Sequence, residues 1–281
     1  MMKTGRIGMP APRSMWEASS EQFHTLVLRG LEETAIAAGH GVLSEVVDTP
    51  QAELAVIRSW AEERRVDVVV LKDLRRDDPR PSVLRAAGVP FVLAGDVRQS
   101  GADAAVLTDN SGATRKLLTD LVALGHRRIG HVGGPGSLLH TQWRQEAYDD
   151  FVAERDLPAL HLEGDYSADS GSRAAATLLA RDEPPTVLVF DNDAMAIGGA
   201  ARARQLGLDV PGDVSLVSWD DSLACQVCDP PLAVLGHRAH QLGMDLGRAA
   251  TAVLAGTADG MRLVQELPDI TPRGSLARAP A

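Results

Sequence analysis

The chain has 281 residues, a length that fits one or two domains when a domain takes roughly 150 residues. Hydrophobic residues make up 44% of the sequence and charged residues 23%, as in an ordinary globular protein, and no apolar run approaches the roughly 20 residues that span a bilayer. The net charge of −10 argues against DNA binding by this chain alone, which would need clustered Lys and Arg. The start of the chain lacks the apolar core of a signal peptide, so we expect a cytoplasmic protein with no membrane partner.

The first hundred residues alternate short apolar runs with amphipathic stretches. The run from Val68 to Leu71 is continuously apolar, as is typical of a parallel strand that is covered on both faces. The pattern predicts strands over residues 5–10, 41–47, 66–71 and 91–94, and helices over residues 21–39, 53–64 and 81–87.

The same alternation then starts again. Leu117, Leu118 and Leu121 give one helix its buried stripe, and Gly125 ends that helix. The pattern predicts strands over residues 104–108, 129–132, 187–190, 214–219 and 261–267, and helices over residues 111–124, 143–155, 171–180, 194–206 and 241–254.

Strands that alternate with helices of this length predict βαβ units and parallel sheets. About ten strands are too many for one comfortable sheet, so we expect an α/β fold of two doubly wound lobes. Open parallel sheets bind ligands beyond the carboxyl ends of their strands, which predicts a cleft lined by those ends. Functional residues are therefore expected just after strands.

Two polar clusters follow predicted strands. Asp191-Asn192-Asp193 comes after residues 187–190, where these side chains either only cap the next helix, or one caps it while its neighbour faces the cleft. Ser218-Trp219-Asp220-Asp221 ends another strand, and an aromatic ring beside carboxylates suits a polyol, because the ring offers an apolar face and a carboxylate accepts from hydroxyls. A solvated acidic turn is the alternative for this second cluster.

Other motifs do not support catalysis, a cofactor or a metal. The turn Gly133-Gly134-Pro135-Gly136-Ser137 lacks both the Gly-Lys of a P-loop and the third glycine of a dinucleotide fingerprint, so it predicts only a flexible turn. His237-x-x-His240 lacks a third ligand. No nucleophile lies in a recognisable catalytic motif, so we expect that this protein is not an enzyme.

Cys225 and Cys228 have a C-x-x-C spacing. A structural zinc site takes four ligands, and no second cysteine pair exists. A thioredoxin-like pair opens a helix, whereas Asp229-Pro230-Pro231 forbids a helix directly after these residues. The spacing therefore favours two loop thiols without a redox or metal role.

The sequence between Thr108 and Pro231 resembles the LacI/GalR family of transcription regulators, specifically their effector-binding domain. The resemblance rests on LTDNSGATRKLLTDLVALGHRRIGHVGG, PPTVLVFDNDAMAIGGAARARQLGLDVPGDVSLVSWDD and DPPLAVLG. The closing LPDITPRGSL is similar to the family's final strand.

The resemblance implies the periplasmic-binding-protein-like fold of type I, whose two lobes are joined by three crossings. In this chain the crossings would fall near Val106, Gly236 and Leu263. The amino-terminal lobe would comprise residues 5–106 and 237–262, and the carboxyl-terminal lobe residues 107–236 and 263–281.

The resemblance also implies effector-binding residues. Arg144 matches the arginine that clamps the effector, although Ala147 replaces the usual glycine before the aromatic residue. Tyr166 matches an aromatic residue that packs on the ligand, and Trp219 replaces the usual Phe or Tyr. Asn192, Asp220 and His237 match other cleft positions. In the amino-terminal lobe the candidates, which lie after strands, are Ser14, Trp16, Lys72, Asp73 and Asp96.

Family members begin with a helix-turn-helix headpiece, whereas Lys3 to Gly8 resembles the sequence just after the family's hinge helix. We therefore expect this chain to lack the headpiece, which was either removed or never present. The implied function is the effector-sensing core of a homodimeric repressor, which binds a sugar or related polyol and reaches operator DNA only through the missing headpiece. The alternative is a solute-binding protein of a sugar transporter, which would need export.

Overall fold

The computed structural model describes residues 4–13, 22–236 and 238–280. The chain divides into a first unit of residues 4–13, 22–109 and 238–266, and a second unit of residues 110–236 and 267–280. Residues 263–266, which we expected in the second lobe, belong to the first unit, because β13 (Arg262–Val264) pairs with β7 (Ala104–Thr108). The other two boundaries lie within a few residues of the expected crossings.

The first unit is a parallel sheet with helices on both faces. Its strand order among the described residues is β13-β7-β6-β5-β1-β3. The further strands of this sheet are β1 (Arg6–Gly8), β3 (Gly41–Leu43), β5 (Val68–Leu71) and β6 (Phe91–Asp96), and a separate short pair joins β2 (Ala11–Pro12) to β4 (Val46–Val47). The helices are α1 (Gln22–Ala37), α2 (Pro50–Glu62), α3 (Arg80–Ala86) and α9 (Ala239–Leu254).

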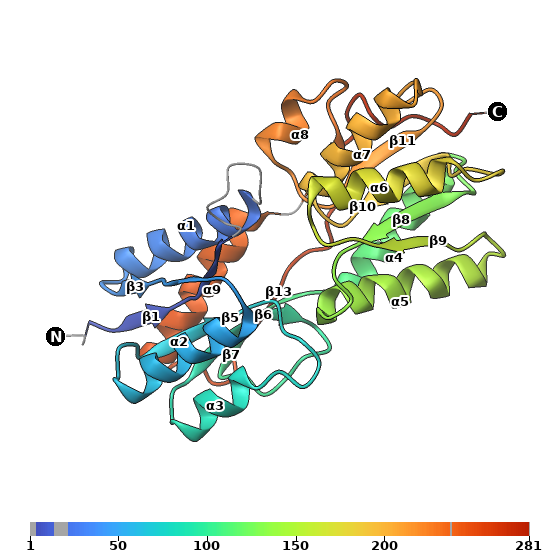
Figure 1. The fold of residues 1–281 in the computed structure, drawn as a ribbon. Coiled ribbons are helices and arrows are strands. Elements are labelled where there is room, and N and C mark those ends of the chain that lie inside the picture. The colour runs from blue at the N-terminus through green and yellow to red at the C-terminus, as the bar shows by residue number, and fades with distance from the viewer. Residues whose placement is uncertain (1–3, 14–21, 237, 281) are drawn as a thin grey trace. The chain divides into compact units, whose positions relative to one another are not determined.

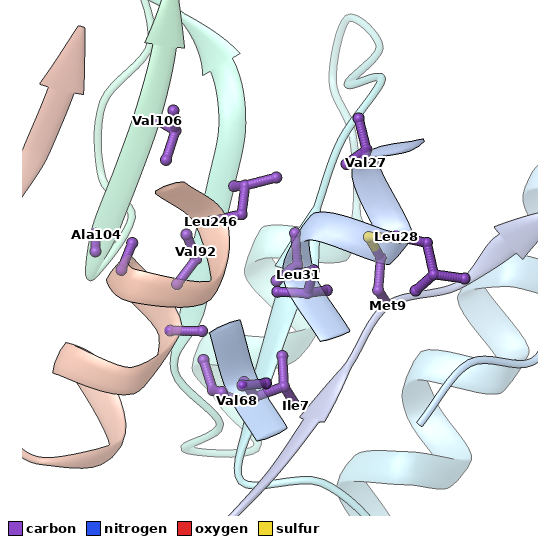
Figure 2. Close-up of a cluster of buried hydrophobic side chains, with 14 of the residues drawn as sticks. Ile7, Met9, Val27, Leu28, Leu31, Val68, Val92, Ala104, Val106 and Leu246 are labelled. Carbon is purple, nitrogen blue, oxygen red and sulfur yellow. The ribbon is translucent and has the colours of Figure 1, made fainter. Parts of the chain in front are cut away.

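The core of the first unit follows from the alternation of side chains along its strands. Val68 and Val92 belong to one buried cluster with Leu31 of α1 and Leu246 of α9 (Figure 2). The opposite face is filled by Trp60 of α2, which is fully buried. A Cβ at Gly8 would lie 2.7 Å from the Trp60 ring, so β1 needs glycine at this position.

The second unit repeats the same winding with the strand order β12-β11-β10-β8-β9, and its strands are again parallel. These strands are β8 (Ile129–Gly133), β9 (Leu160–Glu163), β10 (Val187–Phe190), β11 (Ser215–Ser218) and β12 (Ala233–Val234). The helices are α4 (Asn110–Ala123), α5 (Leu139–Glu154), α6 (Ala168–Leu179), α7 (Asp193–Gln205) and α8 (Leu223–Val227).

Helices cover both faces of the second sheet. Leu188 and Phe190 point to the face of α6 and α7, whereas Val187 and Val189 point to the face of α4 and α5, which lie on opposite sides of the sheet (Figure 1). The predicted α/β fold of two doubly wound parallel sheets is therefore confirmed.

The last residues of the described chain are bonded to the second sheet through Ser275. Its hydroxyl donates to the Leu216 carbonyl at 2.6 Å and accepts from the Ala233 N–H at 2.8 Å. Its backbone N–H and carbonyl also bond to Pro231 and Leu216. This segment is held by hydrogen bonds to β11 and β12, and it forms only an isolated bridge at Thr271 in place of the expected final strand.

One expectation about the cysteines was wrong. Cys225 lies in the short helix α8, not in a loop, because Ser222 caps this helix by accepting from the Cys225 N–H at 3.3 Å. Asp229-Pro230-Pro231 comes only after the helix has ended. Both thiols are free, and burial raises the pKa of Cys225 to about 11.

Candidate functional site

Arg144 lies on α5 and is 8% exposed. Its Nε donates to Asn110 Oδ1 at 3.0 Å, its Nη1 lies 3.5 Å from Asp191 Oδ2, and its Cζ lies 3.8 Å from the centre of the Trp219 ring. These three contacts fix the plane of the guanidinium. Among the described residues no acceptor bonds the remaining nitrogen, Nη2, so this edge can donate to a ligand.

Asp191 follows β10 directly, and its side chain is fully buried. Its Oδ1 accepts from His131 Nε2 at 3.0 Å, and its Oδ2 accepts from the Gly134 N–H at 3.2 Å. Burial alone would raise the pKa of Asp191, but the charge of Arg144 and the donors His131 and Gly134 hold it far below its ordinary value. Asp191 is therefore an anion that compensates the charge of Arg144.

A second histidine lies behind His131. The Nδ1 atoms of His131 and His161 are 3.2 Å apart. Because an ionised Asp191 can only accept, His131 Nε2 is the donor of the bond to Asp191. Burial, followed by the nearby His131, lowers the pKa of His161 to about 4, so this ring is neutral at pH 7.

Tyr166 lies between β9 and α6 with a φ of 68°. Its hydroxyl lies 3.0 Å from His140 Nε2 and 3.1 Å from Thr141 Oγ1, both at the start of α5. A Cβ at Gly134 would lie 2.2 Å from Tyr166 Cζ, so glycine is required beside this ring.

Asn192 both caps α7 and holds Tyr166. Its Oδ1 accepts from the Met195 N–H at 2.9 Å, and its Nδ2 donates to the Tyr166 carbonyl at 2.9 Å. The structure shows that Asn192 is the capping residue of the cluster 191–193, as both alternatives from the sequence require of one member.

Trp219 and Asp220 follow β11. Trp219 is 2% exposed and stacks on Arg144, whereas Asp220 is partly exposed and accepts through its backbone carbonyl from Ser218 Oγ at 2.7 Å. Asp221 instead makes a two-fold ion pair with Arg273, with distances of 2.9 and 2.7 Å, and so attaches the end of the chain. Of this pair, Asp220 stays the candidate for contact with a ligand.

Three of the expected residues belong to the first unit and lie at the ends of its strands or directly after them. Lys72 Nζ lies 2.6 Å from Asp73 Oδ2 after β5. Asp96 ends β6, is 1% exposed and accepts from the Arg98 N–H at 3.0 Å. Ser14, Trp16 and His237 lie outside the described residues.

In the second unit the structure thus brings Arg144 and Trp219 into contact, and likewise Asn192 and Tyr166. Asn110, His131 and Asp191, which hold these residues in place, were not singled out as site residues from the sequence. Asp191 stands in the noted cluster 191–193, and its position at the end of a strand was the available signal.

Arg80 was also missed. It is 3% exposed, pairs with Glu53 and Asp78, and donates to the carbonyls of Lys72 and Asp73 at 3.0 and 3.1 Å. Burial would lower the pKa of Arg80, but its acidic partners raise it. Arg80 therefore fixes the loop that follows β5.

Within the described residues, no three His, Cys, Asp or Glu side chains gather as a set that could hold a metal ion. The same residues contain no helix of the length and apolarity needed to cross a bilayer.

The family model described as "Periplasmic binding protein-like domain" matches residues 118–276. The HTH-type transcriptional regulator MalR of Streptomyces coelicolor is 35% identical over 215 residues, which are 74% of this chain and 62% of that protein. The HTH-type transcriptional regulator CelR of Thermobifida fusca is 31% identical over 211 residues, which are 72% of this chain and 62% of that protein. The chain thus spans less than two thirds of the length of these relatives.

Solved structures agree with the sequence matches. A LacI family regulator from Bifidobacterium animalis subsp. lactis superimposes with a TM-score of 0.88 at 25% identity, covering 98% of each chain. A transcriptional regulator CelR–cellobiose complex superimposes with a TM-score of 0.87 at 26% identity, covering 98% of this chain and 85% of that one.

The fold and these matches define a periplasmic-binding-protein-like effector domain. The chain belongs to the LacI family of transcription regulators. Its relatives bear the names of regulators, in agreement with the expectation that it is not an enzyme.

Proposed function

We propose that this chain is the effector-sensing part of a LacI-type repressor of the cytoplasm, which binds a neutral sugar or related polyol next to Arg144. The contact that carries the proposal is the stacking of the Arg144 guanidinium on Trp219, with Nη2 open to a ligand. A sugar hydroxyl can accept from Arg144, and another can donate to Asp220. The complex of CelR with cellobiose is a precedent from a relative of similar fold.

In this proposal the first unit also contributes effector-binding residues, and binding of the effector modulates DNA binding. The candidates are Lys72, Asp73 and Asp96 after β5 and β6, together with Ser14, Trp16 and His237. We propose that this effect reaches operator DNA through a helix-turn-helix, a motif that the name of MalR gives for that relative. A solute-binding protein of a transporter would share the fold, but the relatives are named as regulators.

The binding site is tested by substitution. A library of neutral mono- and disaccharides that includes cellobiose is screened by thermal shift, and a ligand at 100 times its Kd should stabilise the protein by about 2.7 kcal/mol. Because a hydrogen bond to a charged group contributes roughly 1.5–3 kcal/mol, Arg144→Ala or Asp220→Ala should weaken binding in calorimetry about 10- to 150-fold.

Arg155→Ala is the matched control, since Arg155 follows the same helix and stacks on Phe151 at 3.8 Å. This variant should bind as the wild type does. Unchanged affinity in both folded site variants would contradict the assignment of the site.

We also propose that the chain forms a two-fold dimer, because regulators of this kind read two half-sites of an operator. Sedimentation equilibrium should give the mass of two chains. A monomer at high micromolar concentration would count against the dimer.

A further inference from the structure

The positive charge of Arg144 is already compensated within the second unit. Asp191 Oδ2 lies 3.5 Å from Arg144 Nη1, and the Asp191 side chain is fully buried. Both oxygens of this carboxylate are bonded, one to His131 and the other to the Gly134 N–H. Asp191 is therefore held beside Arg144 by its own hydrogen bonds, and its burial limits screening of its charge by water.

Among the described residues, no Lys and no second Arg is bonded to this ion pair. His161, behind His131, is kept neutral by burial, with a pKa of about 4. Asp220 adds a carboxylate beside Trp219 at the end of β11. Arg144 Nη2 can thus donate a hydrogen bond to a ligand, and the buried Asp191 carboxylate lies next to the same guanidinium.

From this arrangement we propose that Asp191 is a specificity-determining residue, which makes the site accept neutral ligands and reject sugar phosphates and sugar acids. A hydroxyl oxygen accepts from Nη2 without opposing Asp191. An anion at the same place gains the attraction of Arg144 but faces a fixed carboxylate in a low dielectric, and repulsion between like charges of this kind selects against such ligands. This inference rests on the proposed function and extends it to the charge of the effector.

The direct test compares matched ligands at constant ionic strength. Calorimetry on the wild type uses cellobiose against cellobionate, and glucose against glucose 6-phosphate. We expect the neutral member of a pair to bind at least about tenfold more tightly than its anionic counterpart. An anionic member that binds as tightly as its neutral counterpart, and loses affinity in Arg144→Ala, overturns the inference while an effector function stands.

A second arm uses inorganic phosphate and needs no sugar to bind. Thermal shift compares the wild type with Arg144→Ala, Asp191→Asn and Asp150→Asn, the last of which removes an exposed carboxylate from α5 as a charge-matched control. Phosphate should stabilise Asp191→Asn more than the other three proteins, because Arg144 is then uncompensated.

Phosphate that stabilises the wild type more than Arg144→Ala contradicts the inference, and this comparison decides the matter even where Asp191→Asn does not fold. If no sugar of either charge binds, the proposed function fails, whereas the phosphate arm still tests the role of Asp191.

Discussion

Single residues in the candidate site act by holding other residues. Asn192 caps α7 and also fixes the Tyr166 backbone, which has a φ of 68°. The Tyr166 hydroxyl in turn meets His140 and Thr141. The resemblance to the family singled out Tyr166 and Asn192 as candidates from the sequence, but the bond between them depends on loop geometry that no spacing encodes.

Gly134→Ala tests whether the position of the Tyr166 ring matters. The added Cβ would lie 2.2 Å from Tyr166 Cζ, so the ring must move away from His140 and Thr141. We expect about a tenfold loss of sugar affinity, and a loss of about 1–3 kcal/mol in the free energy of unfolding from overpacking. Gly41→Ala, whose Cβ would have its nearest neighbour at 3.9 Å, should leave affinity unchanged. Equal affinities of the two variants would show that the ring does not contact the ligand.

At the scale of elements, most helices, the buried strands and the edge strands β3 and β13 of the first sheet were predictable, whereas the edge strands β9 and β12 of the second sheet were not. The predicted strand over residues 187–190 coincides with β10, which is apolar throughout. Strand β9 was missed because it has four residues at the edge of the sheet, where only Leu160 is buried. Helix α2 begins at Pro50, before the predicted start at 53, and the cap at Thr49 followed by proline was an available signal.

The pairing of β8 with β9 places His161 against His131, which makes stability depend on pH. The pKa of His161 is lowered from 6.5 to about 4 by burial, with a further contribution from His131, and burial also lowers the pKa of His126. Since the folded-state pKa lies below the unfolded value, the unfolded chain binds more protons between these pH values. The free energy of unfolding therefore falls as the pH falls from about 6.5 towards 4.

For His161 alone we expect a loss of about 2–3 kcal/mol between pH 7 and pH 4.5, measured by urea denaturation. His161→Gln should lose less stability over the same interval, because glutamine does not titrate. The same pH dependence in both proteins would contradict this assignment.

At the scale of the whole molecule, the two units repeat one winding of strands, which the alternating pattern predicted. The family was also evident from the sequence, and the comparisons confirm it. The buried partners Asn110 and Asp191, which meet at Arg144 from different elements, could not be predicted, because each is distant from it in sequence. Their contacts arise only when α4, α5 and β10 pack in one unit.

The most direct test of the account is a crystal structure of this chain with cellobiose, or with the first neutral sugar that stabilises it in the screen. The account predicts a sugar hydroxyl oxygen at about 2.7–3.2 Å from Arg144 Nη2, with Asp191 still paired to the same guanidinium. A sugar that binds elsewhere, with no contact to Arg144, would contradict the central claim.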